Sequence, residues 1–324
     1  MANKHGRPGR TWGALFLGAA AGVAFSCYLL VPNLAGGIPG VSAEGFHGIG
    51  SQGARSSGGG DDEQAQLAKE QADAADSAVS GLAEKAVEGK LSNKAVMVVS
   101  TADASQQDVD NVKWLLQKSG ANDAGHIQLT GSFTDQEQSE QLTKLITNTL
   151  PAGASLARGN QHPGTYVGQA LGSALLNKGQ DHKPIASTED RAAMLKALKE
   201  KDFIDYQDGT IRPADGIVFV VGDSDGSGTG DFSAQLEAMM AKEFDSLGSG
   251  AVVAGQLPSA DEAGVLGRLR TNDETGKNVS TVDSVERTFG RLATVLAMAE
   301  QFDGKAGAYG AAANVTAAMP GAEH

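Results

Sequence analysis

The chain has 324 residues, of which 40% are hydrophobic and 5% aromatic, and its formal net charge at pH 7 is −13. A protein this acidic repels the phosphates of nucleic acids, so we expect no DNA or RNA partner. The single cysteine, Cys27, excludes an intrachain disulfide and a zinc site built from several cysteines.

An uncharged segment follows a short basic N-terminus. Residues 1–10 contain three basic residues and no acid, and residues 11–31 read TWGALFLGAAAGVAFSCYLLV. At about 1.5 Å per residue, a helix of this length spans roughly 30 Å, the thickness of the hydrocarbon core of a membrane. Because basic residues favour the cytoplasmic side, the sequence predicts a cytoplasmic tail over residues 1–10, a single-pass transmembrane helix over residues 11–32, and an extracytoplasmic body in the cell envelope.

Two alternatives to a retained anchor remain open. Val41-Ser42-Ala43 resembles a signal-peptide cleavage site, but it lies well past the apolar run, which is longer than the usual core of a signal peptide. A lipoprotein signal ending at Cys27 would need a lipobox before it, whereas Ala24-Phe25-Ser26 matches that motif poorly and the apolar run continues after Cys27. We therefore favour an anchor that stays in the membrane.

Two segments connect the predicted anchor to the body. Residues 33–60 are rich in glycine and serine, which is typical of a flexible linker. Residues 61–92 are predicted to form a heptad helix, because small apolar residues recur there with alternating spacings of three and four: Ala65, Ala68, Ala72, Ala75, Val79, Leu82 and Ala86. A seam made mostly of alanine buries little area, so the pattern fits either a lone solvated helix or a parallel coiled-coil homodimer.

Strands alternate with helices in the rest of the chain. Short apolar runs predict strands at Ala95–Ser100, His126–Leu129, Ile217–Val221 and Ala251–Ala254. Apolar residues at helical spacing predict intervening helices, including 164–176, 188–201 and 232–247. Such alternation implies right-handed crossovers between parallel strands. The sequence therefore predicts an α/β fold, a Rossmann-like three-layer domain with a mainly parallel sheet over residues 94–303, preceded by one transmembrane helix and a short heptad helix.

The end of the chain carries one further helix signal. Asp283, with Glu286 three residues later, has the spacing of a capping box at the start of a helix that buries Val285 and Phe289. The Ala/Gly-rich residues 304–324 are predicted to form a flexible C-terminal tail.

A glycine-rich loop, Gly222–Asp231, follows the predicted strand Ile217–Val221, where ligands usually bind in sheets of this kind. Ser224 lies in a Gly-x-Ser-x-Gly motif, but a nucleophile elbow needs a helix directly after the serine. Gly226, Gly228 and Gly230 lack the spacing of a dinucleotide loop, and aspartates there would repel a pyrophosphate. A solvated loop remains the simplest interpretation.

The same loop also matches part of a calcium-binding pattern. Asp223, Asp225 and Asp231 lie at alternating positions, while Ala234 occupies the place of the bidentate glutamate. These three aspartates are therefore weak candidate metal ligands. No other cofactor is indicated, and no set of residues is recognisable as catalytic, so we expect a protein that is not an enzyme.

Soft ligands for Cu(I) show no chelating pattern in the sequence. Thiolate and thioether sulfurs are the donors that Cu(I) prefers. Six methionines lie outside the predicted span and the initiating residue, and none recurs at a chelating spacing: Met97, Met194, Met239, Met240, Met298 and Met319. We predict that most of them fill the core.

Several short segments carry a family resemblance. They are Thr101-Ala102-Asp103-Ala104 after the first strand, Leu150-Pro151-Ala152-Gly153-Ala154, Ser280-Thr281-Val282-Asp283, Gly290-Arg291 and Tyr309-Gly310. With the N-terminal span and the heptad helix, this order resembles the actinobacterial MctB copper transport family. The resemblance implies a role in copper homeostasis or export, a copper ligand, and association with the membrane and the outer envelope.

The resemblance also implies an alternative function. The glycine-rich linker and the short alanine seam look like the corynebacterial SteB branch of the family. That branch works with a membrane protein partner, SteA, in cell separation and the regulation of peptidoglycan hydrolysis, without catalysis of its own. A single span cannot enclose a pore unless it oligomerises, so transport by this chain would be oligomeric or indirect.

Overall fold

The computed structural model describes residues 59–159, 162–178, 183–271 and 278–321. The chain divides into two compact units, residues 1–79 and 80–324. The predicted tail and anchor, residues 1–32, lie outside the described residues, as does nearly all of the predicted linker. Among the described helices, none combines the length and apolarity needed to cross a membrane.

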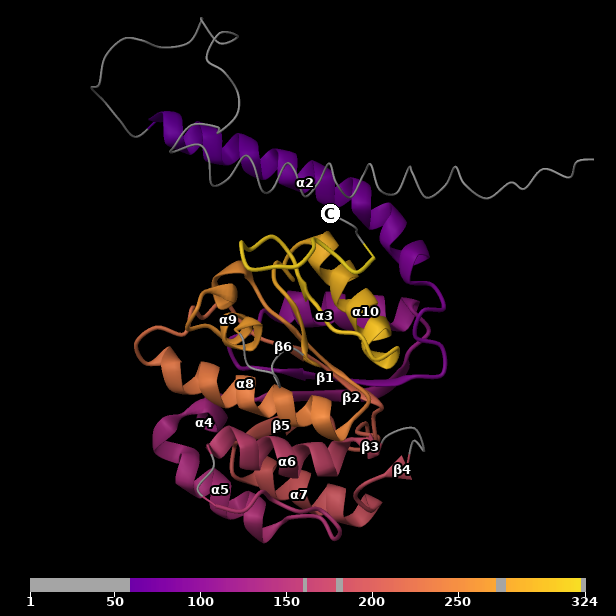
Figure 1. The fold of residues 1–324 in the computed structure, drawn as a ribbon, viewed down its shortest axis with the longest axis vertical. Helices are drawn as coiled ribbons and strands as arrows, with labels where there is room; N and C mark the ends of the chain where they lie inside the picture. Colours follow the sequence, from indigo (N-terminus) through magenta and orange to yellow (C-terminus); the bar gives the residue numbers. More distant parts are fainter. Residues whose placement is uncertain (1–58, 160–161, 179–182, 272–277, 322–324) are drawn as a thin grey trace, which may run out of the picture. The chain divides into compact units, whose positions relative to one another are not determined.

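A seven-stranded sheet forms the centre of the second unit, in the order β5-β2-β1-β6-β7-β8-β9 (Figure 1). Its strands are β1 (Ala95–Ser100), β2 (Asn122–Leu129), β5 (Ile204–Tyr206), β6 (Gly216–Val220), β7 (Ala251–Ala254), β8 (Ser280–Val282) and β9 (Ala308–Tyr309). All neighbours pair in parallel except β5, which runs antiparallel to β2. Two short strands, β3 (Asn177–Lys178) and β4 (Lys183–Pro184), form a separate antiparallel pair.

Helices cover both faces of the sheet. They are α3 (Gln106–Lys118), α4 (Gly131–Thr134), α5 (Ser139–Asn148), α6 (Pro163–Leu175), α7 (Thr188–Glu200), α8 (Gly230–Leu247), α9 (Val265–Arg270) and α10 (Thr288–Phe302). Figure 1 shows α3 and α10 on one face, and α6 and α8 with α4, α5 and α7 on the other. This arrangement confirms the predicted α/β class and the mainly parallel, Rossmann-like sheet.

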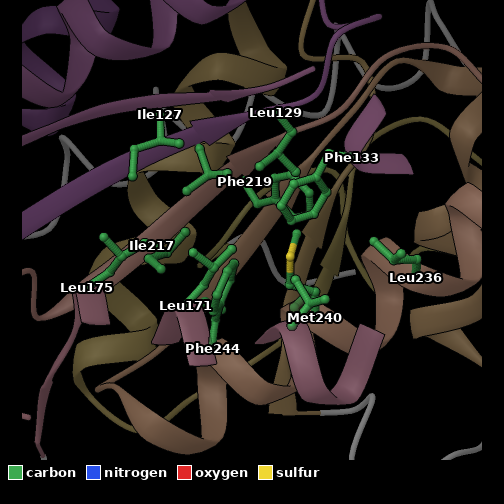
Figure 2. Close-up of a cluster of buried hydrophobic side chains, with 14 of the residues drawn as sticks. Ile127, Leu129, Phe133, Leu171, Leu175, Ile217, Phe219, Leu236, Met240 and Phe244 are labelled. Atoms are coloured by element: carbon green, nitrogen blue, oxygen red, sulfur yellow. The ribbon is translucent and has the colours of Figure 1, made fainter. Parts of the chain in front are cut away.

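The largest part of the core lies between the sheet and the pair α6/α8 (Figure 2). It is built from Ile127, Leu129, Phe133, Leu171, Leu175, Ile217, Phe219, Leu236, Met240 and Phe244, each at most 2% exposed. The rings of Phe219 on β6 and Phe244 on α8 meet edge to face, with centroids 6.5 Å apart. Because β6 is covered on both sides, its sequence is a continuous apolar run rather than an alternating one.

Glycines let α6 approach α8 closely. Gly164, Gly168 and Gly172 recur every four residues and therefore lie on one side of α6. A Cβ placed at Gly168 would lie 2.9 Å from Cα of Met240 and 3.0 Å from its carbonyl oxygen. Ordinary side chains at these positions would push the two helices apart, so this contact depends on the missing Cβ.

The first helix of the described chain, α2 (Gly59–Val87), occupies most of the segment predicted as a heptad helix. Its residues 80–87 belong to the second unit, where Ala83 and Val87 are buried. The pairing of this helix with another copy stays a prediction.

Two expectations for the C-terminal region were wrong. The segment predicted as a flexible tail from residue 304 instead contributes β9 to the sheet, next to β8. Asp283 does not cap α10, which starts at Thr288 after Arg287 and has no side-chain cap. The physical reason is the same in both cases: the Asp283 carboxylate accepts hydrogen bonds from the backbone N–H groups of Ala311 and Ala312, and so holds this segment in place.

Candidate functional site

The order of the strands creates a switch point at the carboxyl ends of β1 and β6. The chain passes from β1 to β2 on one side, and it later enters β6 on the other side of β1. Loops that leave two such strands run apart, and ligands of open α/β sheets usually bind in the crevice between them. The segment Thr101–Ala104 follows β1, and the glycine-rich loop follows β6, so both sequence features lie at this point.

The aspartates of the glycine-rich loop have separate roles. Asp225 accepts a hydrogen bond of 2.8 Å from the backbone N–H of Ser227, and bonds to Ser227 lower the pKa of Asp225. Asp231 forms an ion pair with Arg268, and Asp223 is exposed. Within the described ranges, no group of three or more His, Cys, Asp or Glu side chains could hold a metal ion. The assignment of these three aspartates to a metal stays a prediction.

Close packing accounts for two glycines of this loop. A Cβ at Gly226, where φ is +74°, would overlap the carbonyl oxygen of Ala263. A Cβ at Gly222 would overlap the carboxylate of Asp103 from the loop after β1. The two loops of the switch point are therefore in contact, and these glycines allow backbone contact rather than the approach of a phosphate.

Two carboxyl groups near the switch point influence each other electrostatically, Asp103 after β1 and Glu237 on α8. The hydroxyl of Thr101 donates a hydrogen bond of 2.5 Å to Asp103. Glu237, on α8, is only 7% exposed, and no hydrogen bond or ion pair to its carboxyl is found in the described part of the chain. Burial, with a smaller contribution from the negative charge of Asp103, raises the pKa of Glu237 well above its usual value. Burial of this kind favours the protonated, neutral form of the carboxyl, which can donate a hydrogen bond or a proton.

The structure contains one Ser–His contact that the sequence did not predict. Oγ of Ser100, at the end of β1, lies 2.8 Å from Nε2 of His126 on the neighbouring strand β2. Burial lowers the pKa of His126, followed in effect by the positive charge of Lys113. Ser100 is only 2% exposed, so its hydroxyl is not presented to a substrate. This pair therefore fits a polar contact within the sheet better than a catalytic dyad.

A second polar cluster, the arginine clamp, lies at the carboxyl end of β8. Arg270 and Asp283 form an ion pair of 3.0 Å, and their side chains are 3% and 0% exposed. The same guanidinium also donates to Oγ1 of Thr281, to the carbonyl of Tyr309 and to Oδ1 of Asn314. These four hydrogen bonds of Arg270 tie β8, β9 and the following segment together.

Three segments that carry the family resemblance converge on this clamp. Ser280-Thr281-Val282-Asp283 supplies β8 and the carboxylate, and Gly310 lies so close that a Cβ there would overlap Asp283. Gly290 packs in the same way against the carbonyl oxygen of Ser284. These motifs are therefore explained by the folding of the C-terminal edge of the sheet.

The methionines confirm the prediction that most of them fill the core. Met97, Met194, Met240 and Met298 are each 0% exposed. Met239 and Met319 are partly exposed, on α8 and beyond β9. Fully buried thioethers cannot receive Cu(I) from solvent without local opening of the fold, so these four methionines are not accessible ligands in the folded protein.

A known family matches this chain along nearly all of its length, and individual relatives match a smaller share of it. The family described as "Copper transport outer membrane protein, MctB" matches residues 11–320. Relatives named "Copper transporter MctB" from Mycobacterium tuberculosis (strain ATCC 25618 / H37Rv) and Mycobacterium bovis (strain ATCC BAA-935 / AF2122/97) are each 28% identical over 244 residues, covering 75% of this chain and 77% of the relative. A relative of the same name from Mycobacterium leprae (strain TN) is 28% identical over 229 residues, covering 68% and 71%. The chain belongs to the MctB copper transport family.

Proposed function

We propose that this chain is an envelope protein, anchored in the membrane by residues 11–32, that acts in copper homeostasis or export. The observation that carries the proposal is the family match over residues 11–320, which includes the apolar N-terminal segment as well as the α/β body. The name "Copper transporter MctB" of the relatives supports the choice of metal.

The geometry favours an indirect or oligomeric route for copper. The described residues contain no group of His, Cys, Asp and Glu side chains able to hold a metal, and four methionines are buried in the core. One membrane helix per chain cannot line a pore by itself. Copper would therefore cross the envelope through an assembly, or through a partner that this protein controls.

Deletion of the gene, followed by complementation, tests the proposed function. The deletion strain should grow less well at raised copper concentrations and accumulate copper, and the full chain should restore tolerance. Zinc at matched toxicity serves as the control metal. Equal copper tolerance and equal copper content in the two strains would contradict the proposal.

The proposed topology has its own test. Residues 80–324 should be cut by a protease added to intact spheroplasts, while an epitope placed before residue 11 should stay protected until the membrane is opened. The anchored chain should also sediment with membranes and retain its N-terminus. A body released free of the membrane would favour a cleaved signal peptide instead.

A second candidate function is that of a non-catalytic scaffold for a SteA-like membrane protein during cell separation. It is supported by the exposed apolar side chains Leu82 and Trp114, 48% and 43% exposed, on a body without a recognisable metal group in its described part. This function predicts chained, unseparated cells on deletion, unchanged copper tolerance, and co-purification of a membrane partner. Scoring one deletion strain for both phenotypes separates the two candidates.

Neither candidate requires catalysis. Ser224 and Asp225 are both exposed in the glycine-rich loop, so Ser224→Ala and Asp225→Ala should fold normally. Both variants should complement the deletion as well as the unchanged chain does. A folded variant that fails to complement would indicate an enzyme.

A further inference from the structure

The last turns of α2 use only one of their sides to pack on the body. Ala83 and Val87 are 2% and 0% exposed, and Oγ of Ser80 lies 3.2 Å from Oγ1 of Thr288 on α10. Outside this contact, Glu84 forms an ion pair of 3.0 Å with Lys118 on α3. This side of α2 is therefore occupied within a single chain.

The heptad seam lies on a different side of the same helix. Val79, Leu82 and Ala86 each precede a body-facing residue by one position, which places the seam about 100° further round the helix. Leu82 is 48% exposed, and Val79 and Ala86 are partly exposed. At Leu82, the largest apolar side chain of these turns, the body thus leaves the helix uncovered.

A second exposed apolar side chain lies next to α2. Trp114 on α3 is 43% exposed and lines, together with Ser80 and Ala83, a cavity of about 100 Å³. The ammonium group of Lys118 lies 5.3 Å from the centroid of the Trp114 ring. Leu82 and Trp114 are two of the three large apolar side chains that are exposed in the described chain. Exposed apolar surface is therefore concentrated where α2 joins the body.

We propose that a second copy of this chain covers the seam, so that the protein is a parallel homodimer paired through α2. All seam positions from residue 65 to residue 86 are uncharged, as self-pairing requires. The positions that flank the seam also avoid repulsion: in a parallel, in-register pair, Gln64 would face Lys69, and Gln71 would face Asp76. The charges of the helix at Glu70 and Glu84 lie away from the seam.

The small side chains set the expected strength of this pairing. Alanine lets two helices approach closely but buries little apolar area per residue, so α2 alone gives a weak dimer. Leu82 supplies the largest apolar side chain in the seam, and Trp114 lies close to the same turns of α2, at Ser80 and Ala83. Two copies held in one membrane would gain further from their raised effective concentration, and their helices would run in the same direction.

Disulfide cross-linking of the full chain in its native membrane tests the proposal. In a Cys27→Ser background, Val79→Cys at the seam should form a covalent dimer on mild oxidation. Ser77→Cys is the matched control, because it is exposed and lies two positions, about 200°, round the helix from the seam. Cross-linking of both positions alike, of neither, or of Val79→Cys only to a different protein would overturn the proposal.

The mass of the detergent-solubilised full chain gives a second, independent measurement. Leu82→Lys places like charges across the seam and should weaken dimerisation by about 10-fold or more in sedimentation equilibrium. Leu257→Lys is the control, since Leu257 is 44% exposed and lies in the short helix Leu257–Ala260, outside α2. Both variants should melt at the temperature of the unchanged chain. A monomer in the unchanged chain, or equal dimerisation of the two variants, contradicts the pairing.

Discussion

The α6/α8 side of the body and its β8/β9 edge are held together by different forces. Between the sheet and α6/α8, apolar side chains and missing Cβ atoms make the contact, and Gly168 allows α6 to touch the backbone of α8. At the β8/β9 edge, one buried ion pair between Arg270 and Asp283 organises the strands around it. Apolar packing spreads its free energy over many side chains, whereas the clamp concentrates it in two.

This difference determines how each region should respond to substitution. A core of many contacts loses stability in proportion to the change of volume at one position. A buried ion pair loses far more when one partner is removed than the pair contributes as a whole, because the remaining charge stays buried without compensation. Single substitutions in the two regions should therefore differ in how much stability they remove.

The largest effect is expected from Arg270→Met. It leaves the Asp283 carboxylate buried without its cation and should lower the free energy of unfolding by about 4 kcal/mol. Denaturant unfolding measures the loss, and hydrogen exchange should show that protection falls first in residues 308–317. The double variant Arg270→Met/Asp283→Asn removes both charges and should lose less than the single variant. A double variant that is less stable than the single one would mean that the lost hydrogen bonds, and not the uncompensated charge, determine the loss of stability.

The next effect is expected from Gly168→Val. The added side chain would start 2.9 Å from Cα of Met240, so α6 and α8 must separate, at a cost of about 3 kcal/mol. The control is Gly81→Ala on α2, where a Cβ meets nothing within 4 Å, and helix propensity predicts a gain of about 0.5–1 kcal/mol. Thermal unfolding of both variants measures the contrast. Equal changes in the melting temperatures of the two variants would show that α6 and α8 can move apart without loss of stability.

The apolar side was largely predictable from the sequence. The run Ile217–Val221 predicts a buried parallel strand, and β6 spans Gly216–Val220. The helix predicted at 232–247 is α8, which begins at Gly230. Buried parallel strands and long amphipathic helices leave a pattern in their own residues, because the neighbours that cover them are apolar whatever their identity.

The polar edge was not predictable in the same way. Ser280-Thr281-Val282 is short and mostly polar, so it gives no apolar run, although it forms β8. Asp283 has the local spacing of a helix cap, but its partners are Arg270 and the backbone after β9. A local pattern cannot reveal which distant groups will compete for a carboxylate. Glu237 shows the same limit. A charged residue within a helix predicts a solvated side chain, whereas Glu237 is buried and is affected by the charge of Asp103.

A smaller effect, with a characteristic dependence on pH, is expected from Asp245 near the end of α8. Burial raises the pKa of Asp245 to about 6, from 3.8 in an unfolded chain. The folded state therefore binds more protons between these values, and the stability from this group is present below about pH 4 and is lost as the pH rises through about 6.

The substitution Asp245→Asn removes this dependence. At pH 7 the variant should be more stable than the unchanged chain by about 2 kcal/mol, and at pH 4 the two should be equally stable. Denaturant unfolding at the two pH values measures the difference. A variant that is less stable at pH 7 would show that the ionised carboxylate contributes more through its hydrogen bond from Ala251 than it costs by its burial.

The smallest effect is expected from Glu237→Gln. If the carboxyl is neutral at pH 7, glutamine replaces it with a group of nearly the same size and the same charge, so the free energy of unfolding should change by only about 0.5 kcal/mol. Above the raised pKa the unchanged chain must bury a carboxylate, so there the glutamine variant should become the more stable protein. Asp103→Asn sharpens the argument, because loss of the neighbouring negative charge should lower the pKa of Glu237 and move that crossover to lower pH. A large loss of stability in Glu237→Gln at pH 7 would mean that the Glu237 carboxyl is ionised and bound by a cation. The apolar side of the sheet would then contain a buried charge whose removal costs as much as that of a charge in the arginine clamp.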